Sequence, residues 1–371
     1  MLISTLRCCS LLKSAGIQTR NTRVCVCVCV CIIYYTYIEI KKGEILINQG
    51  FGTQTYENKS PPVNENSIYD VASLTKILST TPIVMKLVSQ KKLNLDHSVK
   101  QFFPNFSGPL KDKVTIKHLL THSSGIEPYY EFFLENPIKS KNEIINDIIN
   151  RELIFDPGID MKYSDLGIIL LGEIIQIIQN KSLDDLTNKY VFNPFNMQNS
   201  FYNPDKIILD KIVPTEVDNR FRKKIVHGEV HDENAFILDG IAPHAGIFSN
   251  AIDIGNYFQM LINGGTWLGK RYFKKSIVEE FTNRQNLPEN SDRAIGFDTP
   301  SQNGKSSAGD YFGAKSFGHL GFTGTSVWAD PESEIIIVLL TNRVYPSRDK
   351  KGIYHARRQI HNSIMKEILV D

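Results

Sequence analysis

A serine and a lysine three positions apart form the sharpest chemical signal in the chain. Ser73 and Lys76 begin a segment whose apolar residues recur at near-helical spacing, and residues three apart on a helix share one face. A serine hydroxyl attacks a carbonyl only when a base takes its proton, which a desolvated lysine with a lowered pKa can do. The helix N-terminus also favours negative charge that develops nearby. The pair predicts nucleophilic acyl chemistry, although a lone Ser-x-x-Lys is more often a helix cap beside a surface lysine.

Two further motifs follow in order along the chain. Tyr163, Ser164 and Asp165 open an apolar stretch, and residues 318–325 have the sequence Gly-His-Leu-Gly-Phe-Thr-Gly-Thr ahead of a strand pattern. With these motifs the chain resembles the serine β-lactamase and penicillin-binding-protein superfamily, in the class C-like branch that includes D-Ala-D-Ala peptidases and family VIII esterases. The resemblance covers about residues 39–370, and residues 119–125 and 245–249 resemble further segments of that family.

A narrower similarity rests on four other segments. Residues 228–235, 243–246, 296–300 and 342–346 look like segments of the lactamase-type domains that occur alone or fused behind family 3 β-N-acetylglucosaminidases. This similarity links the chain to cell-wall sugar and peptide metabolism by association only.

The resemblance implies a role for each motif residue. Ser73 is expected to be the acylated nucleophile and Lys76 its proton partner. Tyr163 is expected to be the base that passes the proton to the leaving group and later activates water. The backbone N–H groups of Ser73 and Phe322 are expected to form the oxyanion hole, where each donor contributes about 3 kcal/mol in serine hydrolases.

Two positions depart from the family pattern. Asp165 stands where the family has Asn, so an amide donor becomes an acceptor-only carboxylate. A carboxylate close to Lys76 also favours the ammonium form and leaves Tyr163 more of the base work. His319, which with Gly321 is expected to line the pocket from an edge strand, replaces a lysine and removes a permanent charge that attracts a substrate carboxylate. Both changes favour an ester or cell-wall peptide substrate over efficient β-lactam hydrolysis.

The elements that must position these residues follow from periodicity. Alternation from Tyr34 with a Lys42-Gly43 turn predicts a β-hairpin, and residues 73–90 predict a long helix in which Pro82 is a possible kink. Other segments predict helices over 166–178, 253–262 and 355–369, and strands over 325–329 and 335–340. Strands at both ends with helices between them predict an α/β (α+β) fold of the β-lactamase/transpeptidase type. In it an antiparallel sheet is flanked by helices, and a mostly helical lobe is inserted. The expected sheet lobe is 32–72 with 265–371, the expected helical lobe is 73–264, and residues 1–31 are an extension.

Composition restricts the function classes. The chain has 371 residues, is 42% hydrophobic and 22% charged, and carries a formal charge of only +2, which predicts a globular protein with no nucleic-acid partner. All six cysteines fall within the first 31 positions. A disulfide framework, a cysteine zinc site and a cysteine nucleophile are therefore excluded for the rest of the chain.

The extension has three interpretations. Residues 1–23 are rich in Ser, Thr and Arg and lack acids, as in an organellar transit peptide. Residues 24–38 are apolar but short for a membrane span, and they suit the apolar stretch of a signal peptide. The Val-Cys repeat of residues 24–31 is also what a translated tandem nucleotide repeat yields. The location thus stays open between the bacterial envelope or secretion, the mitochondrion and the cytoplasm, and any membrane association would be through this segment.

Other candidates are weaker. His227 and His231 do not meet the His-Glu-x-x-His spacing, so no metal is expected, and no cofactor is implied. His231 is instead expected in a hydrogen-bonded loop, with Asp232 and Asn234, at the rim of the site. His122 is expected to serve a cap or turn. The aromatic residues Trp267, Tyr129 and Tyr130 are candidates for lining a cleft.

The function predicted is that of a serine hydrolase acting through an acyl-serine on an ester, amide or peptidoglycan-type substrate. The alternative is a catalytically weak module that recognises cell-wall fragments. The oligomeric state is not indicated.

Overall fold

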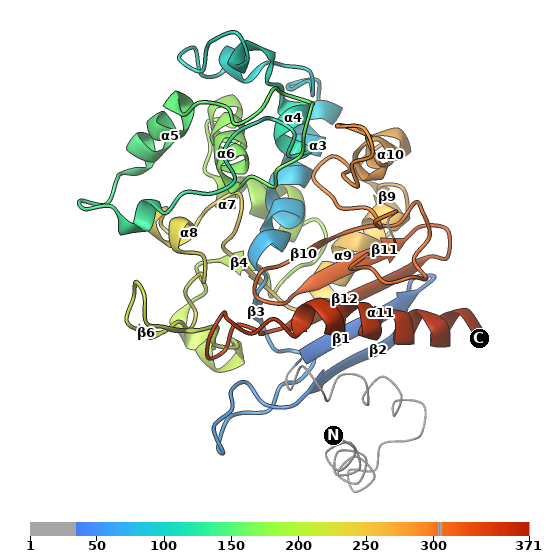
Figure 1. Cartoon of the computed structure of the whole chain (residues 1–371). Coiled ribbons are helices and arrows are strands. Elements are labelled where there is room, and N and C mark those ends of the chain that lie inside the picture. The colour runs from blue at the N-terminus through green and yellow to red at the C-terminus, as the bar shows by residue number, and fades with distance from the viewer. Residues whose placement is uncertain (1–34, 303, 305, 371) are drawn as a thin grey trace, which may run out of the picture.

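A five-stranded antiparallel sheet forms the centre of the molecule (Figure 1). The computed structural model describes residues 35–370 except 303 and 305, so the predicted extension lies outside the described residues. The strand order is β10-β11-β12-β1-β2. The strands are β1 (Tyr35–Lys41), β2 (Glu44–Phe51), β10 (Phe317–Leu320), β11 (Ser326–Asp330) and β12 (Ile335–Thr341).

The predicted hairpin and the joining of the two chain ends are confirmed. Lys42 and Gly43 form the turn between β1 and β2 with φ of 53° and 81°, a conformation that glycine adopts without strain. β1 then pairs with β12 along its whole length, from Tyr35 opposite Thr341 to Lys41 opposite Ile335. The first and last strands of the domain therefore lie side by side in the sheet.

Alternation along β1 builds a separate core on each face of the sheet. Ile38 and Ile40 belong to the larger core, whereas Tyr35 and Tyr37 pack in a second core, because successive side chains of a strand point to opposite faces. Helix α9 (Ala251–Ile262) covers the first face, and α11 (Ile353–Val370) covers the second (Figure 1). β12 is buried throughout, as its continuous apolar sequence predicts.

The remaining helices gather on the side of α9 and form the helical part of the molecule (Figure 1). α6 is strongly apolar, and its bounds agree with the predicted helix over 166–178. α9 lies in the stretch assigned to the helical lobe, yet it packs on the sheet against β12 and β1. The helices are α3 (Thr81–Ser89), α4 (Ile116–Leu120), α5 (Lys141–Asn150), α6 (Asp165–Gln179), α7 (Leu183–Thr187), α8 (Glu233–Ile237) and α10 (Lys275–Thr282).

The predicted helix over 73–90 is helical throughout but consists of three kinds of turn. A 3₁₀ turn, η2 (Ala72–Leu74), is followed by a π-helical turn, η3 (Lys76–Thr80), and then by α3. Thr81 donates its N–H to the carbonyl of Lys76, five residues earlier, and Pro82 next to it has no N–H to donate. The proline therefore begins a new α-helix instead of kinking one, and the wider turn before it carries Lys76.

Short strands complete the architecture. β3 (Tyr69–Asp70), β7 (Ile247–Ser249) and β4 (Phe201–Tyr202) form a small sheet in that order, and two hairpins are β5 (Val217–Asp218) with β6 (Lys224–Ile225) and β8 (Thr266–Trp267) with β9 (Lys270–Arg271). Within residues 35–370, no single helix is long and apolar enough to cross a membrane. One bent pair, α6 with Leu183–Phe192, passes the test of length and composition.

Candidate active site

Ser73 sits on a tight bend between β3 and the helical segment. The carboxylate of Asp70 accepts the N–H of Ala72 at 2.8 Å, and Ala72 has φ of 48°, the left-handed region that L-residues seldom adopt. β7 holds β3 in place, with Tyr69 opposite Ser249. The bend directs the chain straight from a strand into η2, which carries Ser73.

Lys76 is buried and has three polar partners. Its ammonium donates to the Ser73 hydroxyl at 3.1 Å and to the carbonyl of His244 at 2.9 Å, and it lies 2.7 Å from the Asp165 carboxylate. Burial by itself would lower the pKa of Lys76, but Asp165 and Tyr163 act against it and the net pKa is raised. The predicted proximity of Asp165 to Lys76 is thus observed, and Lys76 is an ammonium in the resting protein.

Tyr163 lies next to Lys76. The Lys76 ammonium lies 4.9 Å from the centre of the tyrosine ring. The hydroxyl lies near Lys76 and Ser73, which both lower its pKa, but it meets hydrogen-bond geometry with no described residue. Burial has the larger effect and raises the pKa of Tyr163 overall. Tyr163 is therefore a neutral phenol next to a serine hydroxyl.

His122 supports the Tyr163 ring. Their ring centres are 4.3 Å apart, and His122 Nδ1 accepts the N–H of Ser164 at 3.0 Å. Burial and then the charge of Arg293 hold the pKa of His122 well below its usual value. His122 does occupy a turn, with φ of 57°, but sequence reasoning missed its contact with Tyr163 because 41 residues separate the two.

His319 is on β10, an edge strand of the central sheet, as predicted. Its Nδ1 contacts the carbonyl of Leu320 at 2.8 Å, which places the proton on Nδ1 and leaves Nε2 as an acceptor. Nε2 is buried with no hydrogen-bond partner among the described residues. Burial is the main cause that lowers the pKa of His319 to about 4. The ring is therefore neutral throughout the neutral pH range.

The loop after β10 is fastened to the segment before Ser73. Thr323 donates its hydroxyl to the carbonyl of Asp70 at 2.8 Å, and Thr325 donates to that of Val71 at 3.1 Å. Gly321 lies so close to both segments that an added Cβ would be 2.0 Å from Thr325 Oγ1 and 2.6 Å from the Val71 oxygen. Only glycine fits there, and the two hydroxyl bonds fix Phe322 relative to Ser73.

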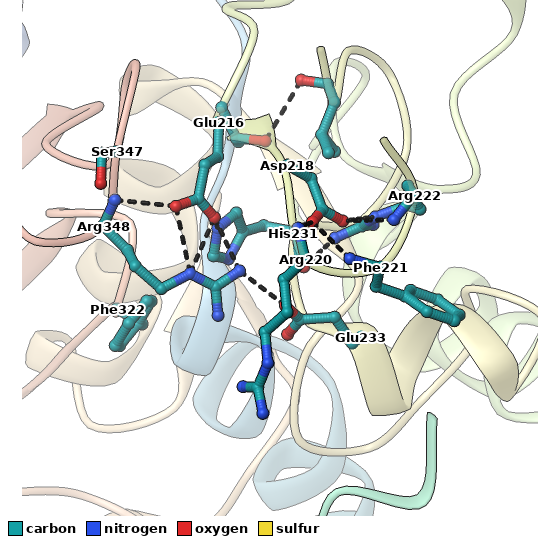
Figure 2. A network of polar contacts seen from close by, with 12 residues as sticks. Glu216, Asp218, Arg220, Phe221, Arg222, His231, Glu233, Phe322, Ser347 and Arg348 are labelled. Atoms are coloured by element: carbon teal, nitrogen blue, oxygen red, sulfur yellow. Dashed lines mark hydrogen bonds and ion pairs between the residues drawn. The ribbon is translucent and has the colours of Figure 1, made fainter. Parts of the chain in front are cut away.

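A polar network continues from Phe322 (Figure 2). The Phe322 ring stacks on the His231 ring, with ring centres 5.7 Å apart. The guanidinium of Arg343 lies over the same Phe322 ring, 4.4 Å from its centre. His231 contacts Glu216 at 2.8 Å and donates its N–H to Asp70 at 2.6 Å. The Phe322 ring and the bend at Ser73 therefore share one support, which includes the His231 predicted at the rim.

Two cavities of about 370 Å³ each open at Ser73, Tyr163 and Phe322. The first, called the arginine cavity, is further lined by His319, Gly321 and a group of charged residues: Arg293, Asp298, Arg343 and Arg357. The second, called the paired-charge cavity, is further lined by Tyr129, Glu131, Asp165, Arg220, Asp232, Glu233, His244 and Arg348. Of the aromatic candidates, Tyr129 lines this cavity, whereas Trp267 packs on the core.

The arginine cavity carries positive charge that the sequence argument about His319 did not foresee. Arg343 and Arg357 are at most 9% exposed and donate to backbone carbonyls. Neither pairs with a carboxylate of the described residues, whereas Arg293 pairs with Asp298. Burial and the charge of Arg343 lower the pKa of Arg357 to about 9, so it stays charged at neutral pH. The charge lost with the lysine is thus supplied from the segment that follows β12 and from α11.

No group of metal-binding side chains is found in the described part of the chain. His227 Nε2 instead contacts the carbonyls of Leu209 and Ile212, at 2.9 and 2.8 Å. Asp232 pairs with His244 at 3.0 Å, and Asn234 donates to the carbonyl of Tyr130 at 2.7 Å. Asp232 and His244 lie in two segments of the narrower similarity, residues 228–235 and 243–246. The sequence did not indicate that these two segments meet.

Known proteins are similar to this chain in sequence and in fold. A family model described as Beta-lactamase matches residues 37–362. A Bacillus subtilis (strain 168) protein named N-acetylmuramyl-L-alanine amidase is 30% identical over 342 residues, which cover 82% of this chain and 76% of that protein. A Salmonella agona (strain SL483) protein with the provisional name D-alanyl-D-alanine carboxypeptidase is 29% identical over 338 residues, covering 82% and 77%. The crystal structure of a class C β-lactamase from Rhodobacter sphaeroides has a TM-score of 0.69 at 15% identity, covering 90% of this chain and 95% of that one.

The antiparallel sheet and its flanking helices are therefore the β-lactamase/transpeptidase-like fold, as predicted. The chain belongs to the Beta-lactamase family. It is a serine hydrolase of that family, with relatives named as an amidase and a carboxypeptidase.

Proposed function

We propose that Ser73 is the nucleophile of an acyl-transfer reaction that hydrolyses an amide or ester bond, with Lys76 and Tyr163 as its proton partners. The observation that carries the proposal is the buried cluster in which the Lys76 ammonium contacts both the Ser73 hydroxyl, at 3.1 Å, and Asp165, at 2.7 Å. A serine hydroxyl so placed has a proton-exchanging group within hydrogen-bond reach. Two cavities that open at Ser73 leave room for the two halves of a substrate.

The proton balance of the attack follows from the raised pKa values of Lys76 and Tyr163. Both groups hold their protons at rest, so the pair must release one proton before it can accept the proton of Ser73. Ser73 Oγ then bonds to the substrate carbon while the N–H groups of Ser73 and Phe322 hold the oxyanion. The accepted proton goes from Tyr163 to the leaving group, and an acyl-Ser73 remains. Water attacks this ester by the same path and returns the hydroxyl.

The leaving group is expected to carry a carboxylate. Arg343 and Arg357 present unpaired positive charge to the arginine cavity, beside His319 and Tyr163, and a buried guanidinium is stabilised by a carboxylate ligand. The name of the Salmonella agona relative fits this requirement, because the D-alanine that a D-alanyl-D-alanine carboxypeptidase releases is an amine that bears a carboxylate. The substrate class proposed is therefore a cell-wall amide.

Burst kinetics test the nucleophile. With p-nitrophenyl butyrate in excess, an acyl-serine enzyme releases one equivalent of p-nitrophenol before the steady state. We expect this burst from the wild type, none from Ser73→Ala, and a burst at least a hundredfold slower from Lys76→Ala. Hydrolysis that persists at the wild-type rate in Ser73→Ala would show that another group is the nucleophile.

A further inference from the structure

His244 is held next to the reacting serine by hydrogen bonds within the site. Its carbonyl accepts from the Lys76 ammonium at 2.9 Å, and the same ammonium donates to the Ser73 hydroxyl at 3.1 Å. The carbonyl before it, that of Pro243, accepts the Thr80 hydroxyl at 2.6 Å. His244 also lines the paired-charge cavity, which opens at Ser73. Its main chain is therefore separated from the Ser73 hydroxyl by a single ammonium group.

Asp232 orients the ring of His244. One of its oxygens accepts the N–H of Ala235 at 2.7 Å, as the N-cap of α8, and contacts His244 Nε2 at 3.0 Å. Burial by itself would raise the pKa of Asp232, but the electrostatic contact and the hydrogen bond with His244 outweigh it and lower the pKa. Asp232 is thus a carboxylate, which can only accept. The ring proton is therefore on Nε2, and the free electron pair of the neutral ring is on Nδ1.

This electron pair has no partner in the described part of the chain. Nδ1 of His244 is enclosed without a hydrogen bond to any described residue, and the residue is 1% exposed. A buried acceptor without a donor is destabilising, and such atoms in native proteins call for an explanation by a bound water or a catalytic role. A carboxylate on one ring nitrogen and a free electron pair on the other are the features of an oriented general base.

Hydrolysis of the acyl-serine requires a base of this kind. Lys76 and Tyr163 have raised pKa values and hold their protons at rest, so they can activate water only in the fraction of molecules that has lost a proton. The electron pair on His244 is available without that loss. We propose that His244, oriented by Asp232, takes the proton of the water that hydrolyses acyl-Ser73. This inference rests on the proposed function of Ser73, and it restricts Tyr163 to the formation of the acyl-enzyme.

The step balances in atoms and charge. The water oxygen bonds to the acyl carbon while one water proton goes to His244 Nδ1, and the negative charge of Asp232 stabilises the imidazolium that forms. The bond from the acyl carbon to Ser73 Oγ then breaks, and Oγ takes a proton from the Lys76 ammonium. His244 afterwards releases its proton to solvent, and Lys76 takes one up. The products are the free acid and the resting protein.

Separate measurement of the two half-reactions tests the proposal. His244→Gln keeps a side-chain amide that can donate to Asp232 and keeps the carbonyl that binds Lys76, but it provides no base. With p-nitrophenyl butyrate we expect a burst of wild-type amplitude at a rate within threefold of wild type, and a steady-state rate at least a hundredfold lower. Mass spectrometry of the intact protein should then show the butyryl-enzyme as the main species. A burst that slows as much as the steady state would show a structural role and overturn the proposal.

A second variant decides the question if His244→Gln does not fold. Asp232→Asn retains the accepting oxygen but removes the charge that stabilises the imidazolium, so the steady-state rate should fall at least tenfold with the burst unchanged. The matched controls are His227→Gln, whose ring contacts two backbone carbonyls, and Asp205→Asn, which caps η8 (Lys206–Lys211) as Asp232 caps α8. Both controls should keep both rates within twofold. A wild-type steady-state rate in Asp232→Asn or in folded His244→Gln contradicts the assignment.

The two proposals fail differently. If Ser73→Ala abolishes the burst while His244→Gln turns over at the wild-type rate, the inference about His244 is wrong and the nucleophile stands. If the burst persists in Ser73→Ala, the proposed function is wrong.

Discussion

The carboxylate of Asp165 sets the protonation of both proton-exchanging residues. It raises the pKa of Lys76 and also that of Tyr163, because a nearby negative charge favours an ammonium and disfavours a phenolate. In the proposed reaction one proton must leave this pair before Ser73 can attack. The rate is therefore expected to increase with pH on the alkaline side of neutrality.

Replacing Asp165 with Asn is expected to shift the alkaline limb of the pH profile of kcat/KM to lower pH by at least one unit. Without the carboxylate 2.7 Å away, Lys76 and Tyr163 lose a proton more easily, and the amide adds a donor for a substrate carbonyl. Turnover of a chromogenic cephalosporin at pH 7 should consequently increase about tenfold. Steady-state kinetics from pH 6 to 10 measure both effects.

Asp160→Asn is the control, because Asp160 is exposed and its carboxylate accepts only the N–H of Met161 among the described residues. Its pH profile should coincide with that of the wild type. A limb that stays in place in Asp165→Asn would contradict the account of this carboxylate.

At the scale of elements, the loop after β10 depends on two threonine hydroxyls. Thr323 donates to the carbonyl of Asp70 and so connects the edge of the central sheet to the bend that carries Ser73. Both expected oxyanion donors, Ser73 and Phe322, lie next to this connection. Their relative position is thus a property of two elements far apart in the sequence.

Thr323→Val should lower kcat about tenfold with KM within threefold of wild type. Valine keeps the volume but removes the hydrogen bond, so the loop shifts and the oxyanion is held less well; losing a donor outright costs 10²–10³. Thr282→Val is the matched control, because it also removes a buried threonine hydroxyl bond, that to Val278 at 2.9 Å on α10. Equal melting temperatures and equal kcat in the two variants would show that the Thr323 bond is only structural.

The sequence predicts elements better than the contacts between them. The hairpin at Lys42 and Gly43 and the helix over 166–178 follow from local turn chemistry and periodicity, and the structure has both. The joining of Lys76 to the carbonyl of His244 spans 168 residues, and no local pattern records it. The π-helical turn at Lys76 was missed for a similar reason, since the effect of Pro82 on the preceding turn depends on how that turn packs.

At the scale of the whole molecule, Glu39 is a buried carboxyl between the sheet and α11. Burial and then the charge of Glu367 raise its pKa to about 7 from an ordinary 4.5. Between these pH values the unfolded chain has released a proton that the folded protein still holds. The contribution of Glu39 to stability therefore decreases as pH rises from 4.5 to 7, by about 3 kcal/mol in total.

Glu39→Gln removes this pH dependence. The free energy of unfolding of the variant minus that of the wild type should increase by about 3 kcal/mol from pH 4.5 to pH 8. Urea denaturation at both pH values measures the gain. Glu44→Gln, on the exposed part of β2, should show less than 0.5 kcal/mol, roughly the range of surface substitutions. A difference between the two pH values no larger than that of Glu44→Gln would contradict the buried-carboxyl account.

The part of the site that could be predicted from the sequence is the part formed by the three motif segments. Ser73, Tyr163 and His319, one from each motif segment, meet at the arginine cavity, and each lies in or just before an element that the pattern could place. The two cavities were not predictable, since Arg357 comes from the last helix and Asp232 from a loop, and only the folded chain brings either to Ser73.

The most direct test of the central claim is mass spectrometry of the protein after reaction with a fluorophosphonate, followed by peptide mapping. One adduct per chain, located on Ser73, is predicted, with none in Ser73→Ala and slower labelling in Lys76→Ala. An adduct on another serine, or labelling that is unchanged in Ser73→Ala, would contradict the assignment of Ser73 as the nucleophile.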